Sequence, residues 1–318
     1  MDRVALFGAA GAIGGSIAAA LRAQGRTYRV VGRSRAELEA RFGADPLAEI
    51  VTWNPDDPAS VRAAARGVDT IFYLVGVPYW QFELHPILMK KALDGAVAEN
   101  VPNIVLIGTV YPFGKPQTPR IREDHPRQPH TFKGQKRKEQ EDLVLAADAA
   151  GSIRGTILRL PDFYGPGVDR SFLASAFQAA LKGGRAQLLG PIDIQHEFQY
   201  VPDVGPVALA LAAERGAFGR TWNLAGPGTI TQREFVERIF AEAGRKPKML
   251  VANKFMLRLL GLFNPLLREV VEMHYLFEMP VVLDDSALQE LLGGVKKTSY
   301  EEGIRATLRA MQNEATTS

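Results

Sequence analysis

The sequence predicts an α/β fold: a doubly wound parallel sheet of the Rossmann type with a smaller, mainly helical C-terminal substrate lobe. Short β-branched and aromatic runs alternate with helical patterns through the first half of the chain. A glycine-rich turn follows the first of these runs and opens the first helical pattern. Because strand–helix–strand units of this length join parallel strands through right-handed crossovers, we expect helices on both faces of the sheet.

The strands are expected where short apolar runs are bounded by Gly, Pro, Asn or Asp, at residues 4–7, 28–31, 50–53, 70–75, 104–107, 156–160 and 221–224. Helical spacing of apolar residues predicts helices over 13–24, 35–42, 59–66, 86–99, 139–149, 171–181, 204–214 and 232–243. We therefore expect a dinucleotide-binding domain over residues 1–165, with a further strand near 221–226. Residues 166–318 should form mainly a substrate-binding lobe, intertwined with the first domain.

The composition limits the classes of function. Hydrophobic residues make up 46% and charged residues 23% of the 318 positions, which indicates a globular protein with a core. A formal charge of +3 is too small to indicate a nucleic-acid partner. The absence of cysteine excludes disulfides and thiolate chemistry and is consistent with a cytoplasmic location. We expect no signal peptide and no membrane span, and the five histidines are too scattered to predict a metal site.

The glycine-rich turn predicts a dinucleotide site. Gly8 permits a tight turn after the first strand, Gly11 allows the backbone to approach a diphosphate, and Gly14 allows close packing of helix and strand. The N–H groups of Ala12 and Ile13 would face the phosphates at the N-terminus of the helix. A strand before the turn and a helix after it are the context that this motif requires.

The end of the second expected strand favours NADP over NAD as the cofactor. An acidic residue at this place would bind the ribose 2′-hydroxyl and repel a 2′-phosphate. The chain instead has Arg33 and Arg35, whose guanidinium groups favour a 2′-phosphate through charge-assisted hydrogen bonds. NAD is the less favoured alternative.

Several motifs, in the same order, resemble those of the extended short-chain dehydrogenases/reductases, the superfamily of sugar-nucleotide epimerases and dehydratases. The GxxGxxG spacing and the segments 158–167, 198–204 and 298–304 carry the resemblance, which covers nearly the whole chain. The resemblance implies that Asn54 contacts the adenine and that Val75 and Gly76 pass the adenine ribose. It also implies that the segment containing Pro161 lies beside the nicotinamide.

The resemblance further implies catalytic groups after the fifth strand and on the next helix. The family pairs a Ser or Thr with a Tyr-x-x-x-Lys motif. Thr109 fits the first position, and Lys136 fits the lysine, which would also bind the nicotinamide ribose. The tyrosine position is then Phe132, so the chain resembles an atypical member that lacks the phenol for proton transfer.

Three consequences of this replacement stay open. Tyr111, two residues after Thr109, would point to the same side if the strand continues, and Tyr164 is a second candidate for the missing phenol. The reaction could instead need little general-acid catalysis, with water as the proton source. The third alternative is that catalysis has been lost.

Tyr79, Trp80, Tyr164 and His196 are the candidate substrate contacts. Tyr79 and Trp80 follow the fourth strand, at the carboxyl edge of the sheet, and would suit an apolar or flat small molecule. The apolar stretch 255–277 predicts a pocket cover or a contact between the subunits of a homodimer, with contact to a membrane surface as an alternative.

Together these patterns predict an NADP(H)-dependent oxidoreductase that acts on a small carbonyl, hydroxyl or activated alkene substrate. Thr109 would orient the substrate oxygen, Tyr111 would act as acid or base, and Lys136 would hold the ribose. Two alternatives stay open. Phe132 favours a catalytically silent NADP(H)-binding redox sensor or scaffold. A nucleotide-sugar epimerase or dehydratase is the other, although an epimerase needs an acid and a base on both faces of a keto intermediate.

Overall fold

The computed structural model describes residues 3–169, 171, 173–279 and 281–317, and its centre is a seven-stranded sheet in which all neighbouring strands are parallel. The order across the sheet is β10–β6–β5–β4–β1–β2–β3. These strands are β1 (Val4–Phe7), β2 (Tyr28–Gly32), β3 (Ala48–Thr52), β4 (Thr70–Tyr73), β5 (Asn103–Thr109), β6 (Arg154–Leu160) and β10 (Thr221–Asn223). The strand order reverses between β1 and β4, and doubly wound folds bind ligands outside the carboxyl ends of strands at such a point.

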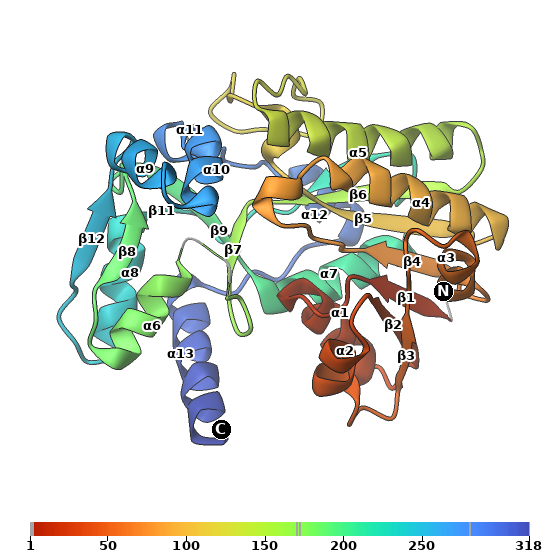
Figure 1. The fold of residues 1–318 in the computed structure, drawn as a ribbon, viewed down its shortest axis with the longest axis horizontal. Coiled ribbons are helices and arrows are strands. Elements are labelled where there is room, and N and C mark those ends of the chain that lie inside the picture. Colours follow the sequence, from red (N-terminus) through yellow and green to blue (C-terminus); the bar gives the residue numbers. More distant parts are fainter. Residues whose placement is uncertain (1–2, 170, 172, 280, 318) are drawn as a thin grey trace.

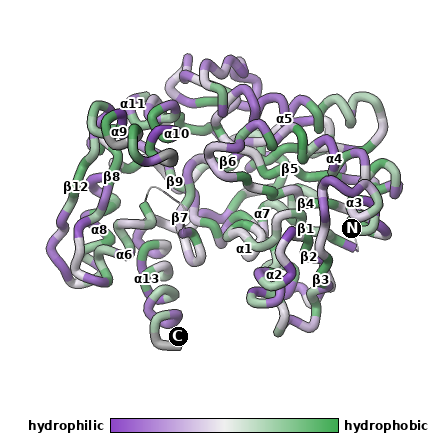
Figure 2. Tube along the Cα trace, in the orientation of Figure 1, coloured by the Kyte–Doolittle hydropathy of each residue, from purple (hydrophilic) through white to green (hydrophobic). Residues whose placement is uncertain are grey.

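Helices cover both faces of the sheet (Figure 1). One face carries α1 (Ala12–Ala23), α2 (Arg35–Phe42), α7 (Val201–Ala213) and α12 (Ser286–Leu292), and the other carries α3 (Pro58–Ala65), α4 (Leu84–Ala98) and α5 (Phe132–Ala149). Successive strand residues point to opposite faces, so Leu6 belongs to the first core and Phe7 to the second. Figure 2 shows β4 and β5 as hydrophobic segments between the two helical layers.

The C-terminal lobe contains two small sheets besides its helices. One has the strand order β11–β9–β7 and the other pairs β12 with β8. Their strands are β7 (Asp162–Tyr164), β8 (Ala186–Leu189), β9 (Gln195–Tyr200), β11 (Thr229–Thr231) and β12 (Met249–Ala252). The helices of this lobe are α6 (Ala174–Lys182), α8 (Gln232–Glu242), α9 (Lys254–Gly261), α10 (Pro265–Met273), α11 (Tyr275–Glu278) and α13 (Tyr300–Thr317). The expected fold class is confirmed, and the five short strands of the lobe are an addition to it.

Helix α5 begins at Phe132, well before the start predicted near Glu139. Thr131 caps the helix, because its Oγ1 accepts a hydrogen bond from Gly134 N at 3.1 Å. The three lysines of the first two turns, Lys133, Lys136 and Lys138, have acidic partners; Lys136, for example, pairs with Glu139 at 2.8 Å. These pairs let a cationic segment form the start of a helix, where the dipole alone would disfavour it.

Helix α7 joins the two parts of the chain. Ser16 of α1 donates to Pro202 O at 3.2 Å and accepts from Gly205 N at 2.9 Å. A Cβ on Gly205 would clash with the backbone of Ser16, so the two helices cross in close contact. Trp222 of β10 and Leu288 of α12 pack into the same apolar core as α1. Residues from the last third of the chain therefore complete the core of the N-terminal domain.

Among the described residues, no helix is both long and apolar enough to cross a bilayer. The same residues include no group of three or more His, Cys, Asp or Glu side chains arranged to hold a metal ion.

Candidate active site

The glycine-rich turn lies between β1 and α1 at the carboxyl edge of the sheet. Gly8 has a φ of +89°, and a Cβ on it would lie 2.8 Å from backbone atoms of Val75. A Cβ on Gly14 would clash with the backbone of Ala9, so both glycines permit close packing. At Gly11, in contrast, the nearest atom to a Cβ would be Gly8 O at 3.9 Å. The space in front of the helix is therefore open.

The first turn of α1 offers N–H groups to this space. Ala12 and Ile13 begin the helix, and no side chain caps it. The first N–H groups of a helix have no intrahelical acceptor, and the helix dipole adds positive potential around them. An open space in front of uncapped N–H groups fits the diphosphate of a dinucleotide.

Three arginines lie near this turn. Arg33 follows β2 and is exposed, without a hydrogen bond or ion pair of its side chain within the part of the chain that the structure describes. Arg35 pairs with Glu39, with 2.7 Å between Nε and Oε1. Arg41, which no sequence motif indicates, reaches the glycine-rich turn, and its Nη1 donates to Ala10 O at 2.6 Å. The cations that border the turn directly are thus Arg33 and Arg41.

The other predicted cofactor contacts follow the same edge of the sheet. Asn54 is exposed after β3, and its Oδ1 accepts from Asp56 N at 3.0 Å. Val75 is buried after β4, and a Cβ on the exposed Gly76 would have no atom within 4 Å. Pro161 is buried between β6 and β7. All four residues thus lie along the carboxyl edge of the central sheet.

The carboxyl end of β5 brings Thr109 together with two tyrosines. The chain leaves the strand after Thr109 and forms a 3-10 turn, η2 (Tyr111–Phe113), in which Tyr111 N donates to Thr109 Oγ1 at 3.4 Å. The Tyr111 hydroxyl lies 2.7 Å from the hydroxyl of Tyr79, which belongs to the 3-10 turn η1 (Tyr79–Gln81). Tyr79, Thr109 and Tyr111 therefore form one cluster, which we call the tyrosine cluster.

Burial determines the acidity of these phenols. Desolvation raises the pKa of Tyr111 well above its ordinary value and that of Tyr79 to about 12. The buried Arg137 lies nearby and donates from Nη1 to His85 Nδ1 at 3.2 Å. Since arginine only donates, His85 accepts at Nδ1, and burial together with the Arg137 charge lowers its pKa to about 2. At neutral pH both phenols are protonated and can donate a proton.

Helix α5 turns the predicted pair Phe132 and Lys136 toward its outer side. The ring of Phe132 is 48% exposed. Lys136 pairs with Glu139, and its ammonium lies 5.5 Å from the centre of the Phe132 ring. The structure thus does not bring Lys136 to Thr109 and Tyr111.

The residues one position further along α5 are the ones that face the tyrosine cluster. Lys133 and Arg137, at i and i+4, are buried. The ammonium of Lys133 lies 5.7 Å from the ring centres of both Tyr79 and Phe82. The charge of Arg137 lowers the pKa of Tyr79 against the larger effect of burial. The helix therefore presents two cations to the site.

Lys133 is also held from the opposite side, by α10. Its Nζ lies 2.6 Å from Glu269 Oε2 and 2.7 Å from Glu272 Oε2, and its backbone N donates to Glu272 Oε1 at 3.1 Å. The side chain of Lys133 is only 1% exposed. Helix α10 is thus fastened over the tyrosine cluster by a buried ammonium between two carboxylates.

Asp162, at the start of β7, adds an acid to the cluster. Its carboxylate is partly buried and has no hydrogen-bond partner among the described residues. Burial raises its pKa to about 6. Besides burial, the charge of Asp162 raises the pKa of Tyr79, Tyr111 and Tyr275.

Two predicted substrate contacts lie in the C-terminal lobe instead, and the structure corrects their role. Tyr164 is 1% exposed and packs against Phe235 with ring centres 4.9 Å apart, so it is a core residue and cannot supply the missing phenol. His196 is buried on β9 beside Phe277, and burial lowers its pKa to about 4. Trp80, in η1, is 56% exposed. Of the four candidates, only Tyr79 joins the cluster.

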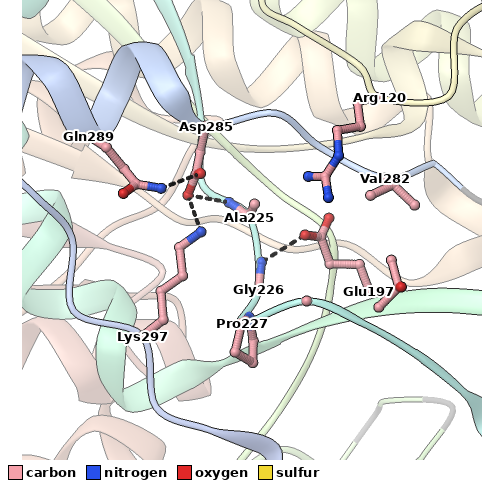
Figure 3. A pocket seen from close by; sticks show the side chains of 11 residues that line it. Arg120, Glu197, Ala225, Gly226, Pro227, Val282, Asp285, Gln289 and Lys297 are labelled. Carbon is pink, nitrogen blue, oxygen red and sulfur yellow. Dashed lines mark hydrogen bonds and ion pairs between the residues drawn. The ribbon is translucent and has the colours of Figure 1, made fainter.

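A separate polar cavity lies at the carboxyl end of β10 (Figure 3). Glu197 accepts hydrogen bonds there from Gly226 N at 3.0 Å and Leu283 N at 2.9 Å, and Asp285 pairs with Lys297 at 2.6 Å. None of the predicted site residues lines this cavity. Because Glu197 binds backbone N–H groups and Asp285 pairs with Lys297, we assign this cavity a structural role at the junction between the sheet and the lobe.

Comparison with known proteins shows the family of the chain. The NAD dependent epimerase/dehydratase family matches residues 4–226, which is more than half of the chain. The chain belongs to this family. A dTDP-6-deoxy-L-talose 4-dehydrogenase (NAD(P)(+)) from Kitasatospora kifunensis is 28% identical over 259 residues, which cover 76% of this chain and 79% of that protein.

Two solved structures share the fold of this epimerase/dehydratase family member. A dTDP-glucose 4,6-dehydratase from Streptomyces venezuelae, with NAD bound, has a TM-score of 0.82 at 20% identity and covers 99% of this chain and 98% of its own. A UDP-glucuronic acid 4-epimerase from Bacillus cereus, in complex with NAD, has a TM-score of 0.80 at 15% identity, with 98% and 99% covered.

Four residues of the site in this family member were not predicted: Arg41, Lys133, Arg137 and Asp162. A signal for Asp162 exists in the sequence, because it lies in segment 158–167, one of the segments that carry the resemblance to the family. Lys133 and Arg137 lie in the basic run that opens α5, and only the packing of the helix separates them from their neighbours. Arg41 carries no sequence signal.

Proposed function

We propose that the protein is an NADP(H)-dependent oxidoreductase that interconverts a small uncharged carbonyl compound and its alcohol. The observation that carries this proposal is the buried tyrosine cluster at the carboxyl end of β5. A carbonyl reduction needs one group to orient the oxygen and another to protonate it. Thr109 and Tyr111 are suited to these two tasks.

The open first turn of α1 supports a dinucleotide cofactor. NAD is bound in both solved structures named above, and the relative from Kitasatospora kifunensis is named for NAD(P)(+). Arg33 and Arg41 favour NADP, because their guanidinium groups provide positive charge at the end of β2 and at the glycine-rich turn. When bound, the nicotinamide supplies or accepts the hydride.

In the reductive direction, Tyr111 donates the proton to the substrate oxygen. Its raised pKa keeps the phenol protonated, and the Tyr79 hydroxyl at 2.7 Å is the first group that can return a proton to it. Arg137 stabilises negative charge that develops on either phenol. We assign Lys133 and Arg137, rather than Phe132 and Lys136, to the helix positions of the family's Tyr-x-x-x-Lys motif.

The charges around the tyrosine cluster favour an uncharged substrate. Lys133 already binds Glu269 and Glu272, so its ammonium has no capacity left for an anionic ligand. Asp162 adds another carboxylate. A nucleoside diphosphate would require cations free to bind it. A neutral carbonyl or hydroxyl compound therefore fits these surroundings better than a nucleotide sugar.

The test is NADPH oxidation with a panel of neutral aldehydes and ketones. We expect turnover by the wild type and its loss in Tyr111→Phe, with NADPH affinity retained. Tyr28→Phe is the matched control, since the Tyr28 hydroxyl binds Asp45 on the far side of the N-terminal domain. Tight NADPH binding without turnover of any compound would favour the silent sensor. Full activity of Tyr111→Phe would remove Tyr111 from the mechanism.

A further inference from the structure

An exposed apolar stripe runs along α9 and the turn that follows it. Phe255 is 74%, Leu259 54%, Leu262 74% and Phe263 85% exposed. Phe255 and Leu259, four residues apart, lie on one side of the helix, and Leu262 and Phe263 follow in the turn. Leu257, on the other side, is 1% exposed and holds α9 to the lobe. The stripe is therefore an outer surface and not part of the core.

The same segment is strongly cationic. Residues 243–268 contain no Asp or Glu, while the whole chain has a formal charge of only +3. The segment has six Lys or Arg residues: Arg245, Lys246, Lys248, Lys254, Arg258 and Arg268. Arg258 is exposed within α9, and the side chain of Arg268 is 69% exposed. Figure 2 shows hydrophobic and hydrophilic residues side by side over α9 and α10.

This charge argues against a second copy of the chain as the occupant of the stripe. Two copies that met through the stripe would bring Arg258 and Arg268 of one copy close to the same residues of the other, and like charges in contact oppose association. An anionic surface that also accepts apolar side chains is the complementary partner. Phe and Leu residues on an amphipathic helix with flanking Lys and Arg have this combination.

We propose that α9 and residues 262–263 bind the surface of an anionic lipid bilayer, with the apolar stripe in the headgroup–acyl boundary. Leu262 and Phe263 form the tip that enters the bilayer. Arg258 and Arg268 bind lipid phosphates. Because α10 follows directly and is fastened to Lys133, the bilayer would lie beside the cover of the tyrosine cluster.

Sedimentation of the full chain with lipid vesicles tests the proposal. We expect binding to vesicles of phosphatidylcholine mixed with phosphatidylglycerol, weaker binding at high salt, and little binding to phosphatidylcholine alone. Leu262→Ser with Phe263→Ser should weaken binding about tenfold or more, and Arg258→Glu with Arg268→Glu should do so for the anionic vesicles. NADPH affinity and melting temperature should not change.

Two control variants make changes of the same kind at other exposed positions. Val97→Ser removes an exposed apolar side chain on α4, and Arg309→Glu reverses an exposed charge on α13; both should bind vesicles like the wild type. The proposal is overturned if the wild type does not sediment with anionic vesicles, or if the stripe variants bind like the controls. A wild-type dimer that the Leu262 and Phe263 changes dissociate would show that a second copy covers the stripe.

Discussion

Arg41 binds the glycine-rich turn, and Arg33 follows β2, which is in contact with that turn. Gly8 N donates to Val31 O at 2.8 Å, so the glycine-rich turn borders the end of β2. Arg41 binds the turn at Ala10 O, and Arg33 follows β2. Cations at this border would bind the additional phosphate that distinguishes NADP from NAD.

We therefore expect the wild type to bind NADPH at least about tenfold tighter than NADH, which corresponds to roughly 1.4 kcal/mol. Arg41→Gln should remove most of this preference by weakening NADPH binding while NADH binding changes little. Arg35→Gln is the comparison, because Arg35 pairs with Glu39 on the surface. Isothermal titration calorimetry gives both affinities, and equal affinities of the wild type for the two cofactors would refute the NADP assignment.

Protonation of Asp162 should lower the rate of the oxidative reaction at acid pH. Burial raises the pKa of Asp162 to about 6, so the carboxylate accepts a proton above that pH and cannot accept one below it. We expect log kcat/KM for alcohol oxidation to rise with pH and level off above about 6. Asp162→Asn should lack this inflection. Asp193→Asn, which alters an exposed carboxylate paired with Arg233, should keep it, and an inflection that survives in Asp162→Asn would exclude this role.

At the level of single residues, the sequence predicts those site residues whose place is set by the backbone at the end of a strand. The glycines of the turn, Thr109 and Tyr111 follow strands whose ends are easily recognised. The register of α5 is different, because Lys133, Lys136 and Arg137 all belong to one polar, basic run that directly follows Phe132. Whether an i,i+4 pair faces inward depends on what packs against the helix, and the carboxylates that hold Lys133 are more than a hundred residues away.

Between elements, a buried ion pair joins α5 to β6. Arg159 binds Glu141 through Nε at 2.9 Å and Nη2 at 2.8 Å, and the two side chains are 1% and 2% exposed. Arg127 adds a third contact to Glu141 at 3.2 Å. The pair lies directly behind the carboxyl ends of β5 and β6 and so supports the position of the tyrosine cluster.

Glu141→Gln should lower the free energy of unfolding by about 3 kcal/mol, because it leaves the Arg159 charge buried without its counterion. Urea denaturation measures the change. Glu139→Gln, on the same helix, removes an exposed partner of Lys136 and should cost less than about 0.5 kcal/mol. Similar losses in the two variants would show that burial does not set the strength of the Arg159–Glu141 pair.

The difference between predicted and observed elements has a physical cause. All seven strands of the central sheet are predicted, and the inner strands such as β1, β4 and β5 are the plainest, because burial on both faces makes them continuous apolar runs. The five strands of the lobe are missed, since they are short and most of them mix polar with apolar residues; β9, for example, reads Gln-His-Glu-Phe-Gln-Tyr. Their pairing depends on partners distant in sequence, as when Thr229 of β11 lies opposite Glu197.

For the whole molecule, the two predicted domains should not unfold independently. The core beneath α1 contains residues of α7, β10 and α12, all of which come after residue 200. We expect a single calorimetric transition for the full chain, with equal calorimetric and van't Hoff enthalpies. A fragment of residues 1–165 should not give a cooperative transition, because it would expose the core side of β6 and α1. A stably folded fragment would show that the N-terminal domain is independent.

Because Lys133 is fastened between Glu269 and Glu272, access to the tyrosine cluster should respond to the surrounding electrolyte. Helix α10 can lift only if one ammonium and two carboxylates separate and become hydrated, and dissolved ions screen such charges once water reaches them. The ease with which small molecules enter and leave should thus depend on the ionic strength of the medium, even when the compounds themselves carry no charge.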